Sequence, residues 1–136
     1  MDELLAAYQA TDYRVRLARG GFASIRVDRP LPAELVSLVG SAHWGFITAW
    51  NPQSQPLARQ VNRHAQHLLL RALRGRPDTR VYAAMGVSAD SKWREPSLFV
   101  VGPDIGQLDP LARRFGQNGY LRGQGDGLAA LRWMTK

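Results

Sequence analysis

The order of predicted elements between residues 45 and 122 constrains this fold more than any other feature of the sequence. Apolar runs predict strands, and apolar positions three and four residues apart predict helices, in the order strand, helix, strand, strand, helix, strand. The predicted strands span 45–50, 81–87, 97–102 and 118–122. This order is typical of a split βαβ unit, an antiparallel sheet with both helices on one face. We therefore predict an α+β fold with a ferredoxin-like core.

Shorter predicted elements precede this core. Residues 13–17 and 23–27 alternate apolar and polar side chains around Gly20-Gly21, which is the pattern of a β-hairpin. Residues 33–39 favour a short helix, and Gly40 is suited to end it. The sequence thus predicts that a hairpin extends the core sheet, but it leaves open whether the hairpin covers the sheet face.

The 136 residues match one domain of common size. We expect residues 1–44 to form an N-terminal helix and hairpin extension. Residues 45–133 would form the core and a C-terminal strand, which follows the turn at 125–127. No repeat or long linker divides the chain, so the prediction is a single domain.

The first core helix is long and amphipathic. Ser54 is the predicted N-cap, Pro56 lies in the expected first turn, and Gly75 ends the pattern. The predicted buried stripe is Leu57, Val61, Ala65, Leu68 and Ala72. The opposite, exposed side carries Arg59, Arg63, His67 and Arg74. For the second helix, Asp109-Pro110 is the predicted start, with an earlier start at Asp104 as the alternative, and Gly116 is the expected C-cap.

Strand directions in a split βαβ unit bring polar residues from distant segments to one rim of the sheet. The end of strand 45–50, the start of the long helix, the loop 88–96 and the start of strand 118–122 would meet there. The candidate ligand-binding residues on this rim are Asn51, Ser54, Trp93, Glu95, Ser97, Gln117 and Asn118. The helix N-terminus would add a positive dipole end, so we expect a small polar or anionic ligand.

Each candidate also has a purely structural interpretation, which the sequence leaves open. Asn51 and Ser54 would either orient the ligand or only form a turn and a helix cap. Trp93 would either line the site or only pack its loop onto the core. Glu95 is the single candidate for a general base or a cation partner. Because no second catalytic group is evident, the sequence favours a binding or regulatory domain and assigns no catalytic residue. A small enzyme with Glu95 as acid or base is an alternative.

The charge favours acidic partners. The formal net charge is +7, and 16 of the 18 basic residues are arginine. A second alternative is therefore an RNA-binding or single-stranded-DNA-binding protein, with Arg59, Arg63 and Arg74 as candidate contacts. Phe46 and Trp50 are expected on one face of the sheet, where they would stack bases or pack in the core. The other interpretation is a compositional arginine bias in a protein without such a partner, because charge alone does not identify a binding function.

Several classes of site are disfavoured. The chain has no cysteine, which excludes disulfides, thiolate zinc sites and cysteine nucleophiles. His64 and His67 have a metal-compatible spacing, but no carboxylate follows within a turn, so we interpret them as surface residues and expect no metal or cofactor. No apolar run is long enough to span a bilayer, and the acidic N-terminus lacks the basic flank of a signal peptide. We expect a cytoplasmic protein that does not bind membranes, and its oligomeric state cannot be read from the sequence.

Three ordered motifs resemble a known family. They are FITAWNP at residues 46–52 with Ser54 and Asn62, then Trp93-x-Glu95-Pro96-Ser97, then FGQN at residues 115–118. This combination resembles the bacterial family catalogued as domain of unknown function 3293, from about Tyr8 to Leu131. The resemblance implies a small bacterial protein and brings no established activity. Its characteristic residues match the rim positions given above.

Overall fold

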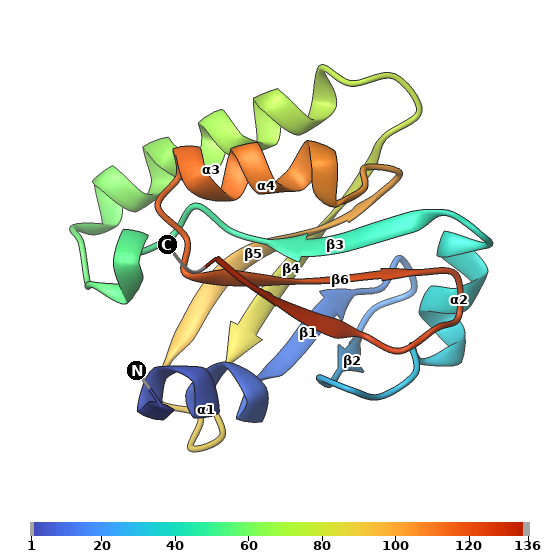
Figure 1. Cartoon of the computed structure of the whole chain (residues 1–136), viewed down its shortest axis with the longest axis horizontal. Coiled ribbons are helices and arrows are strands. Elements are labelled where there is room, and N and C mark those ends of the chain that lie inside the picture. The colour runs from blue at the N-terminus through green and yellow to red at the C-terminus, as the bar shows by residue number, and fades with distance from the viewer. Residues whose placement is uncertain (1, 135–136) are drawn as a thin grey trace.

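Seven strands form one antiparallel sheet in the computed structural model of the chain, in which residues 2–134 are described (Figure 1). Four α-helices and one short 3-10 turn accompany the sheet in this part of the chain. In chain order the elements are α1 (Asp2–Ala10), β1 (Asp12–Arg16), β2 (Phe22–Ile25), α2 (Ala33–Val39), β3 (His43–Ile47), the turn Pro52–Ser54, α3 (Arg59–Arg74), β4 (Arg80–Val87), β5 (Arg94–Val101), α4 (Ile105–Arg114), β6 (Gly119–Gln124) and β7 (Ala130–Trp133). The predicted α+β class is confirmed.

The strands lie in the order β2-β1-β4-β5-β3-β6-β7, and every neighbouring pair is antiparallel. β3 and β4 both pair with β5, so these two strands run parallel to each other. The predicted hairpin is present, and β1 pairs with the edge of β4, while β7 pairs with the other edge at β6. The ends of β3 and β4 therefore share a rim with the starts of β1, β5 and β6.

Helices α3 and α4 lie side by side on one face of the sheet (Figure 1). Leu69 and Leu73 of α3 and Leu108 of α4 are fully buried there against the strands. Gly45 of β3 permits this close packing, because a Cβ at that position would lie 2.5 Å from Cδ1 of Leu108.

The opposite face of the sheet curls into a half-barrel and is not open. A second core fills it with side chains from β1, β2, α2, β3, β5 and β6, among them the fully buried Trp44 and Phe99. Phe46 lies in this core, where its ring meets that of Tyr13 edge to face at 5.1 Å. The prediction that Phe46 shares a face with Trp50 was wrong, because β3 ends at Ile47 and the chain has left the strand before Trp50.

The long helix begins later than the sequence indicates. Ser54 does not cap it: Asn51, Gln53 and Ser54 have left-handed backbone torsions, and α3 starts at Arg59 after an extended stretch. The residue before α3, Ala58, makes no side-chain capping bond. Consequently the positive end of this helix does not lie at Ser54, and the anion site expected there loses that support.

The buried stripe of α3 is also rotated from its predicted position. The buried residues are Asn62, Leu69 and Leu73, whereas Val61 is 53% exposed and Leu57, before the helix, 44% exposed. The shift by one position has a specific cause, since Asn62 turns inward to bind the loop after β3. A polar side chain with buried partners therefore displaced an apolar one from the core-facing side.

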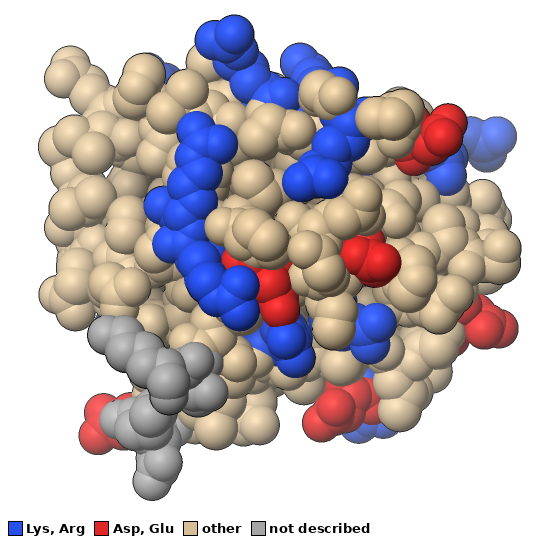
Figure 2. All heavy atoms as spheres, turned by 45° about the horizontal axis from the view of Figure 1, so that its top comes forward, with Lys and Arg blue, Asp and Glu red and all other residues tan. Residues whose placement is uncertain are grey.

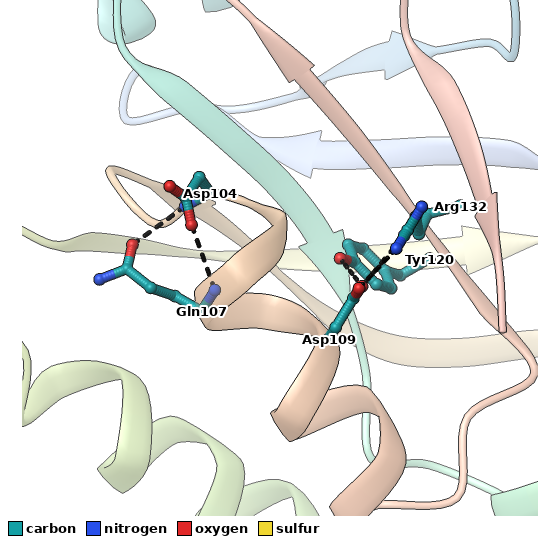
Figure 3. Close-up of polar contacts among 5 residues, drawn as sticks. All are labelled: Asp104, Gln107, Asp109, Tyr120 and Arg132. Carbon is teal, nitrogen blue, oxygen red and sulfur yellow. Dashed lines mark hydrogen bonds and ion pairs between the residues drawn. The ribbon is translucent and has the colours of Figure 1, made fainter.

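Helix α4 begins after Asp104, the earlier of the two starts considered. Asp104 and Gln107 form a reciprocal capping box, in which each side chain accepts a hydrogen bond from the other residue's backbone N–H (Figure 3). Asp109-Pro110 is not the start but lies within the helix. The buried Asp109 carboxylate instead accepts hydrogen bonds from Tyr120 of β6 at 2.6 Å and from Arg132 of β7 at 2.6 and 3.1 Å. The Asp109 carboxylate thus ties α4 to β6 and β7 at one edge of the sheet.

Candidate functional site

A cavity of about 530 Å³ opens at the predicted rim, and we call it the rim cavity. The concave side of the sheet, with Tyr13, Phe46 and Ser97, forms its inner wall. Helix α1 lies over the same rim and contributes Tyr8, and the loop after β4 contributes Trp93 (Figure 1). The sheet topology has thus brought together segments that are more than 80 residues apart in the chain.

Glu95 is the central polar group of the rim cavity. It lies on β5, because that strand starts at Arg94, three residues before its predicted start, so the connecting loop is shorter than 88–96. Nε1 of Trp93 donates a hydrogen bond to Oε2 of Glu95 at 2.9 Å. Burial raises the pKa of Glu95 above its ordinary value, while the hydrogen bond from Trp93 and the nearby Asn51 side chain oppose the shift. A partly buried carboxylate thus faces the cavity.

Tyr8 and Ser54 form a second polar group on the same wall. Nδ2 of Asn118 donates to Oγ of Ser54 at 2.9 Å, and the Ser54 side chain lies near the Tyr8 hydroxyl, where it opposes the rise that burial causes in the pKa of Tyr8. Burial raises the pKa of Tyr8, and the charge of Glu95 raises it further. The ring of Tyr8 packs edge to face against Trp133 of β7 at 5.1 Å. A phenol and a carboxylate therefore line one cavity.

Three of the candidate residues, Asn51, Gln117 and Asn118, do not line the cavity but form hydrogen bonds within the loops beside it. Asn51 and Asn62 exchange two hydrogen bonds, one from Asn51 N to Asn62 Oδ1 at 2.8 Å and one from Asn62 Nδ2 to Asn51 Oδ1 at 2.6 Å. Nε2 of Gln117 donates to the carbonyls of Trp50 and Phe115, both at 3.2 Å. Asn118 supports Ser54. These side chains fix the loop from which Ser54 is presented.

Of the seven predicted rim residues, the structure thus places four on the cavity wall, namely Ser54, Trp93, Glu95 and Ser97. Sequence reasoning missed Tyr8, Tyr13 and Thr48. Tyr8 lies on the predicted N-terminal helix, and its only signal as a site residue would have been the hairpin's pairing with β4, which brings α1 to this rim. Which residues touch a ligand stays a prediction.

The ionisable lining of the rim cavity is acidic. Its carboxylates are Glu95 and, at the mouth, the exposed Asp90, whose pKa is lowered by hydrogen bonds from the Ser88 hydroxyl and the Lys92 backbone N–H. Among the described residues, no lysine or arginine lines this cavity. An incoming cation or neutral donor would meet a favourable potential there, whereas an anion would not.

A second, shallower hollow of about 360 Å³ lies on the other side of β5, and we call it the helix hollow. Arg59, Arg63 and His67 of α3 line one side of it, and Trp50, Pro96 and Leu98 line the other. Strand alternation separates the two sites, because successive side chains of β5 point to opposite faces. Glu95 and Ser97 therefore face the rim cavity, while Pro96 and Leu98 face the helix hollow.

Gln66 of α3 lies between the two sites and forms hydrogen bonds to the backbone of both the loop after β3 and β5. Its Oε1 accepts hydrogen bonds from the backbone N–H of Ala49 at 2.8 Å and from Oγ1 of Thr48 at 3.2 Å. Its Nε2 donates to the carbonyl of Pro96 at 3.3 Å. The third candidate arginine, Arg74, lies in the last turn of α3 and does not line the hollow.

The part of the chain that the structure describes contains neither a group of metal ligands nor a helix able to span a membrane. No three histidine, aspartate or glutamate side chains gather there as a group able to hold a metal ion, and His64 and His67 are both exposed. Within residues 2–134, none of the helices combines the length and the apolar character needed to cross a membrane.

Comparison with known proteins gives one match. The model of a family described as "Protein of unknown function (DUF3293)" matches residues 47–119, more than half of the chain. The matched span contains all seven predicted rim residues and excludes α1 and β1, so it is shorter than the resemblance in the sequence suggests. Neither the curated proteins nor the solved structures gave a match.

Proposed function

The chain belongs to the DUF3293 family, which brings no activity with it, and we propose from the geometry that the protein binds a small molecule in the rim cavity. The ligand has an apolar body and presents a hydrogen-bond donor, neutral or cationic, to Glu95. The observation that carries this proposal is the partly buried carboxylate of Glu95 in a largely apolar cavity. The volume of about 530 Å³ is in the usual range for small-molecule sites.

The hydrogen bonding of Glu95 supports a donor on the ligand. An ionised carboxylate has about four lone-pair sites, and Nε1 of Trp93 donates to one of them, while the nearby Asn51 side chain opposes the rise that burial causes in the pKa of Glu95. Because a buried charge without full hydrogen bonding is costly, a ligand donor would relieve part of that cost. The Tyr8 hydroxyl and Ser54 would add polar contacts, and the ring of Trp93 would cover the ligand at the mouth.

The acidic lining narrows the ligand class. The sequence left a polar or an anionic ligand open, and the cavity favours the donor-bearing polar class over the anionic one. A binding or regulatory role needs nothing more than this site.

An enzyme that uses Glu95 as acid or base is the second candidate. The raised pKa of Glu95 favours it, since a general acid or base acts best when its pKa approaches the working pH. Chemical conversion of a bound ligand, lost in Glu95→Gln, would distinguish this candidate from simple binding.

We also propose two finer assignments. Strands β3 to β6, in the order β6-β3-β5-β4 and with α3 and α4 on one face, support a split βαβ, ferredoxin-like core within the larger sheet. The sequence resemblance supports a bacterial origin and the composition supports a cytoplasmic location, which fractionation of cells that express the protein would test.

Three probes that share one ring test the ligand class: benzylamine, benzyl alcohol and benzoate. We expect amide chemical-shift changes at the rim for the amine and the alcohol and weaker or no changes for benzoate. Glu95→Gln should weaken benzylamine binding about tenfold, as expected for a lost charge-assisted hydrogen bond. Glu34→Gln, an exposed substitution on α2 at the other end of the sheet, is the matched control. Stronger binding of benzoate than of benzylamine would overturn the proposal.

A further inference from the structure

The two helices that cover the sheet carry an uncompensated band of arginine. Six of their arginines are exposed, four on α3 and two on α4: Arg59, Arg63, Arg71, Arg74, Arg113 and Arg114. Helix α3 has no acidic residue, and the single acid within α4, Asp109, is buried and paired with Arg132. Figure 2, which turns this face toward the viewer, shows blue side chains crossing it with few red ones among them.

The basic side chains of α3 lie along one stripe. At 3.6 residues per turn, positions 59, 63, 67, 71 and 74 fall within an arc of about 120°. With a rise of about 1.5 Å per residue, Arg59 and Arg74 are about 22 Å apart along the helix axis. This spacing is longer than a single phosphate or mononucleotide and matches a chain of several phosphates.

The helix hollow lies at the start of this stripe and offers a place for a ring. Trp50 lines it together with Leu70, Pro96 and Leu98, and Arg59 and Arg63 lie at its side. Aromatic rings beside guanidinium groups bind unstacked bases through their π-faces, with little dependence on sequence. Bases in a duplex are stacked and paired, so they do not reach a hollow of this kind.

We propose that single-stranded nucleic acid binds along α3, with one base in the helix hollow against Trp50 and the adjacent phosphates on Arg59 and Arg63. Arg71 and Arg74 extend the contact along the helix. This function is separate from the rim cavity, since the β5 alternation and the Gln66 contacts place the two sites on opposite sides of one strand. It also uses a different surface from the sheet face of RNA-recognition domains, which is buried here.

Fluorescence anisotropy of labelled oligonucleotides of about ten residues tests this proposal, with single-stranded RNA, single-stranded DNA and duplex DNA at about 50 and about 200 mM salt. We expect single strands to bind more tightly than the duplex. The double substitution Arg59→Gln and Arg63→Gln should weaken single-strand binding about tenfold or more at the lower salt. It should also reduce the slope of log affinity against log salt by about 1.4, because each phosphate contact on a single strand contributes about 0.7.

The matched control is Arg19→Gln with Arg29→Gln, which removes the same charge from exposed positions in and after the hairpin. Control binding should fall no more than about twofold. Trp50→Leu should weaken binding about tenfold and Trp50→Phe much less, because phenylalanine keeps a stacking surface. Circular dichroism and thermal unfolding of each variant establish that it is folded before binding is compared.

Two results would overturn the proposal. One is an equal loss of affinity in the control and in the Arg59/Arg63 variant, which would make the attraction a property of net charge alone. The other is duplex binding as tight as single-strand binding, which would remove the role of the hollow.

Discussion

The rim cavity and the helix hollow differ in almost every chemical respect, although the first residues of β5 line both. The rim cavity is deep, acidic and covered by α1, whereas the helix hollow is shallow and basic, and the arginine stripe of α3 extends from it. Residues 95 and 97 line the rim cavity, and residues 96 and 98 line the helix hollow. One strand with a period of two can therefore support two sites of opposite charge without a second domain.

The comparison also identifies what the two sites share. The loop after β3 contributes Ser54 to the rim cavity and Trp50 to the helix hollow, and the Asn51–Asn62 pair holds this loop against α3. Variants at this loop should affect both sites, and variants beyond it should affect one. Four predictions test that difference.

Asn62→Ala should have the largest effect. It leaves the backbone N–H of Asn51 without its buried partner, and Oδ1 of Asn51 keeps only the hydrogen bond from the Leu57 N–H, so we expect the free energy of unfolding to fall by about 2–4 kcal/mol. Urea unfolding measures the loss, and binding at both sites should weaken together. Gln53→Ala, an exposed change in the same loop, is the control and should cost less than about 1 kcal/mol. Equal losses in the two variants would contradict the shared role of the Asn51–Asn62 pair.

Asp109→Asn should have the next largest effect and should act on the rim cavity alone. Its carboxylate holds the Tyr120 hydroxyl and Arg132, and Tyr120 lines the cavity (Figure 3). We expect the free energy of unfolding to fall by about 1–3 kcal/mol at neutral pH.

The effect of Asp109→Asn should depend on pH. Hydrogen bonding to Arg132 lowers the pKa of Asp109, so the folded state binds this proton more weakly than the unfolded state. The stabilisation is present above the ordinary aspartate pKa of about 4 and is lost as the pH falls through the lower folded value. Urea unfolding at pH 7 and near pH 3 should therefore show a smaller difference between wild type and variant at the acidic pH. A difference that does not change with pH would contradict the ion pair's contribution.

Glu95→Gln should have a smaller effect on stability, and of opposite sign. Because burial raises the pKa of Glu95, the folded state holds this proton more tightly, and stability falls as the pH rises from the ordinary value of about 4.5 through the raised one. Without ligand, the variant should be more stable than wild type at pH 7, by about 0.5 kcal/mol, and should gain less near pH 4. Thermal unfolding at the two pH values measures the change. Nucleic-acid binding should stay within about twofold of wild type, and a larger change would show that the two sites are coupled.

Tyr8→Phe should have a smaller effect on ligand binding than Glu95→Gln. It removes the hydroxyl near Ser54 but keeps the ring that packs on Trp133. We expect benzylamine affinity to fall about threefold, equivalent to about 0.6 kcal/mol, and stability to change by less than about 1 kcal/mol. Titration by NMR measures the affinity, and Tyr82→Phe, on β4 outside the cavity lining, is the control. An unchanged affinity would remove Tyr8 from the ligand contacts.

Local patterns predicted most of the elements correctly. The Gly20-Gly21 hairpin and the helix over 33–39 before Gly40 both follow from torsion preferences and periodicity within about ten residues. The start of α3 was missed because Ser54 and Pro56 form a cap-like pattern, yet the left-handed torsions at Asn51, Gln53 and Ser54 belong to a turn that packs against the loop at Gly116. A cap and a turn use the same residue types, and only the distant partner decides between them.

The sequence by itself determined the order of elements, the rim at which β3, β5 and β6 meet, and four of the side chains that line its cavity. These follow from periodicity and from the handedness of strand connections, which are properties of short segments and of topology. Only the tertiary structure decided that α1 brings Tyr8 to the cavity, that the sheet curls so that side chains of the hairpin and α2 help to fill its concave face, and that Asn62 rather than Val61 turns inward. The physical reason is that these outcomes depend on buried hydrogen bonds and packing between segments far apart in the chain, whose energies no local pattern contains.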